Sequence, residues 1–189
     1  MSSNAPVAQA HYDAVTIRLH WAIVALVALQ WLGAELIDYV PDRSMHRLYW
    51  SIHITLGLII AVTVAAHLWW RHRHGRQLSN VNPGGWRLLS RAMHWTLSLL
   101  PALLVVLGLS IIAARGWNLY GVLAIPALPG GSRHLAHNIT GIHEWTAHIV
   151  VVLALGHAAA ALFHYYRLRD GVLKRMIPSL AGSTQRTGA

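Results

Sequence analysis

Long apolar runs separated by short charged segments dominate the chain. Leu48–Trp70 and Ala92–Ala114 each contain 23 residues without a charge, and Trp145–Tyr166 contains 22. A fourth run, Leu19–Ala34, has 16 such residues, and apolar flanking residues extend it past Glu35. Because a helix needs about 20 apolar residues to cross a hydrocarbon core of about 30 Å, the pattern predicts four membrane-spanning helices. We expect these spans at about residues 17–40, 48–70, 92–114 and 143–166.

The predicted fold is an all-α integral membrane four-helix bundle in a single domain. The domain covers residues 1–178, and we expect residues 179–189 to form a flexible tail. Four spans place both termini on one side of the membrane. The segments on that side carry 11 Lys and Arg residues, whereas the two opposite loops carry four. The positive-inside rule therefore predicts that both termini are cytoplasmic, and a bacterial inner membrane is the simplest setting.

The composition agrees with a membrane protein and excludes several other classes. Hydrophobic residues make up 55% of the chain and charged residues only 11%, whereas soluble domains carry about 25% charged residues. This excludes an ordinary cytosolic domain and, despite a formal charge of +9, a nucleic-acid-binding module. The chain has no cysteine, which excludes disulfides, thiolate metal ligands, a cysteine nucleophile and covalent C-x-x-C-H haem attachment.

Histidines are unusually frequent, with 14 in the chain against six acidic residues. His143 and His157 are 14 residues apart on the fourth predicted span, and His53 and His67 are 14 apart on the second. Fourteen residues fall 40° short of four helical turns and rise about 21 Å, so each pair shares one face at two depths. Two antiparallel helices with this pattern can hold two planar tetrapyrroles, each iron bound by imidazoles from both sides.

Other interpretations of these histidines are weaker. A single zinc ion needs converging ligands, which side chains spread over about 21 Å cannot supply. A proton relay normally includes carboxylates, and Glu144 is the only acidic residue within the last three predicted spans. Each histidine alone can hydrogen-bond a neighbouring helix, and a histidine-lined transporter without haem is a further alternative. The matched depths favour two haems.

Several short motifs resemble the bacterial cytochrome b561 family. They are Arg18-Leu19-His20-Trp21, Ile52-His53, Arg115-Gly116, Ile142-His143-Glu144, the segment LGHAAAALFHY at 155–165, and Met176-Ile177-Pro178. The resemblance covers about residues 16–178 and implies a four-helix membrane protein with two b haems. One branch of the family is superoxide oxidase, which passes an electron from superoxide outside the cell to ubiquinone in the membrane.

The resemblance also implies iron ligands. By the matching motifs, His53 and His143 hold the outer haem iron, and His20 and His157 hold the inner one. The family would have an arginine at the position of His67, so this histidine, spaced to match His157, is a rival inner ligand. We favour His20 because its surrounding Leu-His-Trp matches the family and because His67 can instead contact a haem propionate.

Four further residues are candidates for cofactor or substrate contacts. His94 and His164 fall near the expected inner haem, where imidazole could hydrogen-bond a quinone or deliver its proton. An interfacial contact with lipid headgroups explains them equally well. Arg115 and Arg133 lie on the outer side and could form a funnel for an anion or contact propionates.

The predicted function is transmembrane electron transfer by an oxidoreductase with two haem b cofactors. Because iron with two axial imidazoles has no open position, outer-sphere electron transfer is expected. The favoured reaction oxidises superoxide on the periplasmic side and reduces ubiquinone. The alternative is a cytochrome b subunit that passes electrons from a periplasmic dehydrogenase or hydrogenase to quinone, with the apolar outer segment 116–142 as its docking surface. The expected partners are membrane lipid, quinone, and superoxide or a periplasmic electron donor, without nucleic acid.

Overall fold

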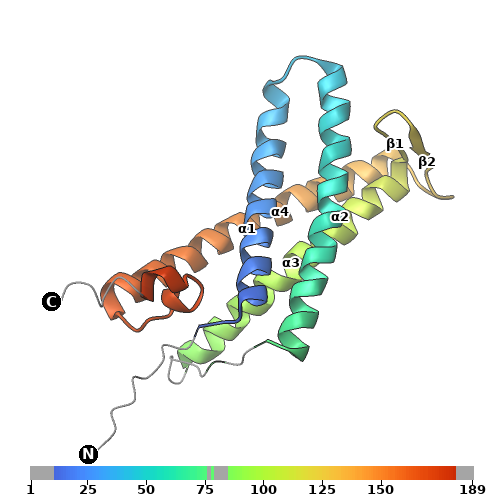
Figure 1. Cartoon of the computed structure of the whole chain (residues 1–189). Coiled ribbons are helices and arrows are strands. Elements are labelled where there is room, and N and C mark those ends of the chain that lie inside the picture. Colours follow the sequence, from blue (N-terminus) through green and yellow to red (C-terminus); the bar gives the residue numbers. More distant parts are fainter. Residues whose placement is uncertain (1–10, 76–77, 79–84, 182–189) are drawn as a thin grey trace, which may run out of the picture.

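Four long helices form the protein (Figure 1). The computed structural model describes residues 11–75, Leu78 and residues 85–181. The helices are α1 (Ala14–Leu36), α2 (Arg43–Arg73), α3 (Gly85–Arg115) and α4 (Arg133–Phe163). All four are long and apolar enough to cross a membrane, which confirms the predicted all-α membrane fold.

Short polar side chains mark the starts of three helices. Asp13 accepts a hydrogen bond from the backbone of Thr16 at 2.9 Å and caps α1. Asp42 caps α2 through the backbone and hydroxyl of Ser44, and these hydrogen bonds hold the pKa of the Asp42 carboxyl below its usual range. Ser132 caps α4, which therefore begins well before the predicted span at 143. Each cap satisfies a backbone N–H that has no partner within its helix.

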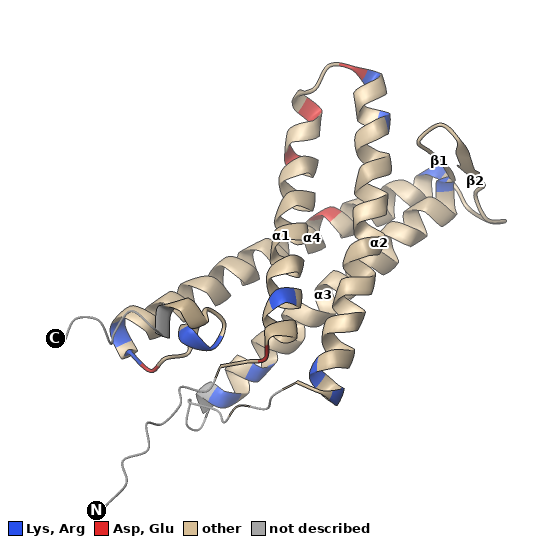
Figure 2. Cartoon of the chain, viewed as in Figure 1, with Lys and Arg blue, Asp and Glu red and all other residues tan. Residues whose placement is uncertain are grey.

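The helices form two antiparallel hairpins that cross each other (Figure 1). The turn between α1 and α2 contains a 3-10 helix, Ile37–Tyr39. Gly33 allows these two helices to approach closely, because a Cβ there would lie only 2.8 Å from Cε2 of Tyr49. The second hairpin consists of α3 and α4, and α2 packs against α3. Lys and Arg lie mainly toward helix ends (Figure 2), and exposed apolar side chains such as Val62 cover the middle of the helices.

A β-hairpin joins α3 to α4. It consists of β1 (Trp117–Leu119) and β2 (Leu123–Ile125), which pair antiparallel with Trp117 opposite Ile125. Tyr120 and Gly121 have φ values of 52° and 76°, the left-handed conformation that tight hairpin loops require. Sequence analysis did not anticipate this hairpin, because runs of apolar residues do not distinguish a short strand from a loop.

The described chain ends meet at one end of the bundle. After α4 the chain forms a π-helical turn, His164–Leu168, and two 3-10 helices, Leu173–Arg175 and Pro178–Ala181. The backbone N–H of Tyr12 donates to the carbonyl of Arg175 at 3.1 Å, which joins the start of the chain to this segment. Of the predicted flexible tail, residues 179–181 belong to the last 3-10 helix, and residues 182–189 lie outside the described part of the chain.

Candidate functional site

A cavity of about 550 Å³ lies between the helices in the half of the bundle that contains the α1–α2 turn. All four helices line it, with Trp31 from α1, His53 from α2, Gly108 from α3 and His143 from α4 among the lining residues. Its volume falls in the usual range of small-molecule and cofactor sites, about 300–1,000 Å³. The predicted outer ligands therefore share one cavity.

The imidazole rings of His53 and His143 have centroids 6.3 Å apart and planes at 62°. An imidazole nitrogen lies about 2 Å from a metal that it binds, with the ring centroid about 1 Å further back, so two rings on opposite sides of one metal have centroids about 6 Å apart. The spacing of this pair fits an iron between the rings.

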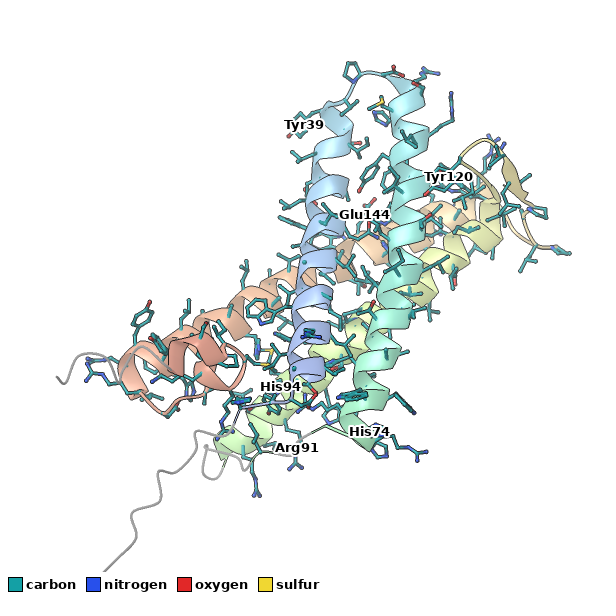
Figure 3. The ribbon with its side chains drawn as sticks, in the orientation of Figure 1. Tyr39, His74, Arg91, His94, Tyr120 and Glu144 are labelled. Carbon is teal, nitrogen blue, oxygen red and sulfur yellow. The ribbon has the colours of Figure 1, made fainter. Side chains whose placement is uncertain are left out.

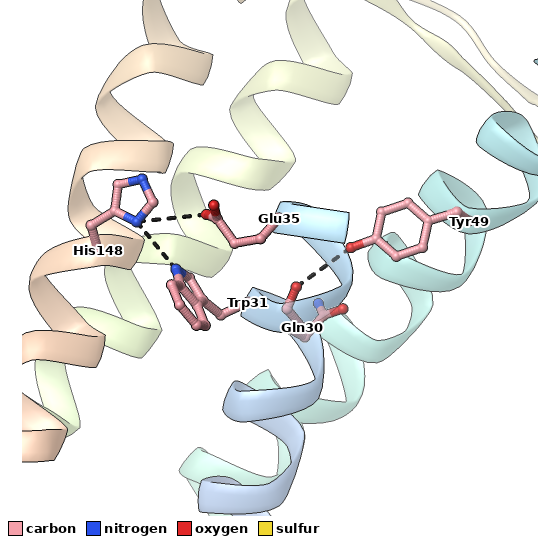
Figure 4. Close-up of polar contacts among 5 residues, drawn as sticks. All are labelled: Gln30, Trp31, Glu35, Tyr49 and His148. Atoms are coloured by element: carbon pink, nitrogen blue, oxygen red, sulfur yellow. Dashed lines mark hydrogen bonds and ion pairs between the residues drawn. The ribbon is translucent and has the colours of Figure 1, made fainter. Parts of the chain in front are cut away.

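A hydrogen-bond chain orients His53. The Tyr49 hydroxyl donates to the Gln30 carbonyl at 3.4 Å (Figure 4). The same hydroxyl lies 3.3 Å from Nδ1 of His53. With the hydroxyl proton donated to Gln30, the Tyr49 oxygen can accept from Nδ1–H in the His53 tautomer whose basic nitrogen is Nε2. Metal-binding histidines commonly donate their other N–H in this way. The Gln30 side chain also donates to the backbone carbonyl of His53 at 2.9 Å.

His143 presents a buried polar atom without a protein partner. No hydrogen bond to its Nδ1 is found among the described residues, although the backbone of Leu104 interacts electrostatically with the ring. Beside it, a Cβ added at Gly108 would lie 3.6 Å from Cε1 of His143, so this glycine keeps open the space that a longer side chain would fill. Unpartnered buried polar atoms are uncommon in proteins, and both features fit a site that holds a cofactor.

The rim of this cavity carries both signs of charge. Arg115 lines it and lies over the Trp117 ring at 5.1 Å, whereas Arg133 begins α4 and does not line it. The acidic lining residues are Glu35, Asp38 and Glu144, the last labelled in Figure 3. An anion therefore meets attraction at Arg115 and repulsion at the carboxylates.

His148 joins the two crossed hairpins at the same rim. The Trp31 indole N–H donates to Nδ1 of His148 at 3.1 Å, and a Glu35 carboxylate oxygen lies 3.8 Å from that nitrogen (Figure 4). His148 also lines the cavity, and its contacts with Trp31 and Glu35 join α4 to α1.

A second histidine cluster lies toward the other end of the bundle, with one side chain from each helix. The ring of His94 lies 5.2 Å from that of His157, and His20 interacts electrostatically with both of them and with His67. His67 is only 9% exposed, and its Nε2 has no hydrogen-bond partner within the described part of the chain. The structure thus brings the predicted ligands His20 and His157 together with the rival His67, and it adds His94 as a neighbour of His157.

His94 and His164 lie in different surroundings. His94 lines a second cavity of about 390 Å³ that is also lined by Tyr12, Arg71 and Arg91. Nδ1 of His164 instead contacts the carboxylate of Asp170, which also accepts the backbone N–H of Val172. The two predicted quinone candidates therefore occupy different environments at the same end of the bundle.

Sequence analysis missed three residues that contact the predicted ligands and candidates. They are Gln30, Tyr49 and Asp170. Gln30 is a polar residue within an apolar run, and Tyr49 is four residues before His53, a spacing that places two side chains together on a helix. Both signals were present in the sequence. The contact between His164 and Asp170 depends on the π-helical turn, which the sequence pattern does not indicate.

Comparison with known proteins places the chain among bacterial haem proteins. The family model for prokaryotic cytochrome b561 matches residues 11–179. The chain is 29% identical to a probable superoxide oxidase, CybB, of Yersinia pestis over 90% of the chain and 98% of that protein. It is 30% identical to cytochrome b561 homolog 1 of Escherichia coli K12 over 88% of the chain and 97% of that protein. It is 28% identical to cytochrome b562 of Cereibacter sphaeroides over 88% of the chain and 94% of that protein.

Proposed function

The chain belongs to the prokaryotic cytochrome b561 family, and from that premise we propose that it oxidises superoxide at the outer face of the membrane and reduces ubiquinone. At the level of the family, it is a multi-pass bacterial inner-membrane oxidoreductase that transfers electrons by means of haem b. The number of haems, the donor and the acceptor are the proposed parts. We also propose a single domain over residues 1–178 with both termini in the cytoplasm.

The observation that carries the proposal is the His53–His143 pair, whose ring centroids lie 6.3 Å apart in the larger cavity. In our assignment these residues hold an outer haem, and His20 and His157 hold an inner one, with His67 as the rival of His20. The hydrogen bond of Tyr49 to His53 orients the first ligand. A b haem bound by two histidines supplies one-electron transfer and offers no open position to dioxygen.

Superoxide fits as the donor because it is a small anion that gives up one electron without a binding pocket. Arg115 is the basic residue that lines the outer cavity, and Arg133 is exposed at the start of α4. The name of the Yersinia pestis relative supports this donor. In balance, two superoxide anions are oxidised to two dioxygen molecules, and the two electrons with two protons convert ubiquinone to ubiquinol.

Ubiquinone reduction needs a proton source as well as electrons. His94 and His164 are the proposed contacts with the quinone at the inner end. The Asp170 carboxylate accepts from Nδ1–H of His164, which leaves Nε2 as the basic nitrogen of the neutral imidazole. Nε2 takes up a proton from water, and the resulting imidazolium delivers that proton to a quinone oxygen. His94 lies against His157, near the proposed inner haem.

Two measurements on the purified full-length chain test this function. We expect two b haems per chain by pyridine haemochrome analysis, and haem reduction by superoxide in stopped-flow mixing without a protein partner. A second-order rate constant above about 10⁷ M⁻¹s⁻¹, beyond ordinary protein association, supports a diffusing anionic donor. A much slower reaction contradicts superoxide oxidation and favours electron delivery by a docked periplasmic dehydrogenase or hydrogenase. A colourless protein contradicts both.

A further inference from the structure

The β1–β2 hairpin and the segment after it form an apolar surface that the electron-transfer function does not use. From Gly116 through Ser132 the chain has no Asp, Glu, Lys, Arg or His. Val122 is 87% exposed, Leu128 62% and Leu123 56%. Soluble loops of this length normally carry charge, so the surface requires an occupant.

Hydrogen bonds fix the hairpin to the N-terminal half of α2. The hydroxyl oxygen of the buried Ser51 accepts from the indole N–H of Trp117 at 3.3 Å and from the backbone N–H of Tyr120 at 3.1 Å. The Tyr120 hydroxyl also lies 2.7 Å from the hydroxyl of Thr55. Figure 1 shows the hairpin beside the half of α2 that follows the α1–α2 turn.

These contacts fix the depth of the hairpin relative to the membrane. The uncharged run of α2 begins at Leu48. With a rise of 1.5 Å per residue, Ser51 and Thr55 lie about 5 Å and 10 Å further along the helix. An uncharged run of 23 residues is about as long as the hydrocarbon core is thick, so both hydroxyls lie within the apolar layer. The hairpin bonded to them lies at the same level.

Part of the backbone of this segment is paired within the protein. Non-helical backbone at membrane depth needs partners for its polar groups, and lipid cannot supply them. The two strands pair with each other, and the N–H of Val122 donates to Leu119 at 3.1 Å. Further along, the N–H of Leu128 donates to the carbonyl of Ala113 at 2.8 Å.

From these observations we propose that the segment 116–132, hereafter the hairpin surface, is embedded in the outer leaflet and contacts phospholipid acyl chains. Exposed apolar side chains also cover the middle of the neighbouring helices, such as Val62 of α2 at 70% exposure. Arg115 and Arg133, which flank the hairpin surface, are then placed to reach the headgroup region. The competing occupants are a periplasmic electron-donor protein and a second copy of this chain.

A spin label tests the occupant directly, because the chain has no cysteine and each introduced thiol is unique. The full-length protein with its haem is labelled at Val122→Cys and placed in nanodiscs of phosphatidylethanolamine and phosphatidylglycerol. Collision of the nitroxide with oxygen, which concentrates in lipid, and with a water-soluble nickel chelate is measured by power saturation. Val106→Cys, at 59% exposure on α3, is the lipid control, and Met45→Cys, at 52% exposure between Arg43 and Arg47, is the control at the polar end of α2.

We expect the label at 122 to match the lipid control, with an oxygen-to-nickel accessibility ratio several-fold above that at 45. A ratio equal to that at 45 would place the hairpin in water and overturn the proposal. Protection from both reagents would also overturn it, because a second copy then covers the surface. If Val122→Cys loses haem, Leu128→Cys provides the same test on the hairpin surface. The accessibility of the label does not depend on the identity of the electron donor. The experiment can therefore overturn this proposal without contradicting the proposed function, and the reverse also holds.

Discussion

The hydroxyl oxygen of Tyr49 lies 3.3 Å from Nδ1 of His53, one turn further along α2. With the hydroxyl proton donated to the Gln30 carbonyl on α1, the Tyr49 oxygen is free to accept from Nδ1–H of His53, the direction that a metal bound at Nε2 would require. These hydrogen bonds make α1 part of the outer site, although α1 contributes none of the proposed outer ligands. The electron density on the imidazole, and with it the potential of a metal bound there, depends on a contact between two helices.

Removing the tyrosine hydroxyl tests this dependence. In Tyr49→Phe, Nδ1–H of His53 loses its acceptor, so the imidazole becomes a weaker donor to ferric iron. We expect the midpoint potential of one haem to rise while both haems stay bound, as measured by optical redox titration. Tyr39→Phe is the matched control, because Tyr39 is 83% exposed on the α1–α2 turn. Equal shifts of both haems, or no shift, would contradict the assigned hydrogen bond.

Gly33 offers a second way to disturb the same contact. A Cβ at this position would lie 2.8 Å from Cε2 and 2.9 Å from the hydroxyl of Tyr49. We expect Gly33→Ala to displace the tyrosine, to destabilise the protein by about 1–3 kcal/mol and to reproduce the potential shift of Tyr49→Phe. Thermal unfolding and redox titration measure the two effects. Gly57→Ala is the control, since its Cβ would meet Gln30 at an ordinary 3.7 Å, and an equal loss of stability there would refute the argument.

The space beside His143 can be filled in two steps. A Cβ at Gly108 would lie 3.6 Å from the His143 ring, so Gly108→Ala should be tolerated with both haems bound. Gly108→Leu adds three more carbons in the cavity, and we expect the haem content to fall from two per chain to one. Loss of both haems, or retention of both in the leucine variant, would show that this cavity does not hold the outer haem.

Single substitutions can identify which histidines of the inner cluster bind the haem iron. The cluster consists of His20, His67, His94 and His157. We expect His157→Ala and His20→Ala each to reduce haem from two per chain to one, whereas His67→Ala retains two. His72→Ala, an exposed histidine in the last turn of α2, serves as the control. If His67→Ala or His94→Ala halves the haem content and His20→Ala does not, the inner ligand assignment is wrong. Pyridine haemochrome analysis per mole of chain gives the answer.

The sequence predicted the parts of this fold that depend on local composition. Apolar runs located four spans, and the 14-residue spacing selected histidines that the structure brings together at the outer cavity, although their binding of iron stays a prediction. The contact of His94 with His157 was missed because it depends on how α3 packs against α4, which no local pattern specifies. The early start of α4 at Arg133 was missed because charged residues and histidines interrupt the apolar run while Ser132 still caps a helix.

The rim of the outer cavity carries both positive and negative side chains, so substitutions there can test whether the electron donor is an anion. Arg115 and Glu35 both line the cavity, so neutralising them should change the approach of superoxide in opposite directions. At low ionic strength we expect Arg115→Gln to slow haem reduction by about two- to tenfold and Glu35→Gln to accelerate it, as expected for one unit charge near the path. Arg18→Gln, at the opposite end of α1, is the control and should change nothing. At 0.5 M salt the differences should largely vanish, because screening confines surface electrostatics to a few ångströms. Slowing by Arg115→Gln that persists at high salt would assign this arginine to holding the site together, and equal slowing by both variants would exclude an anionic donor that is guided by charge.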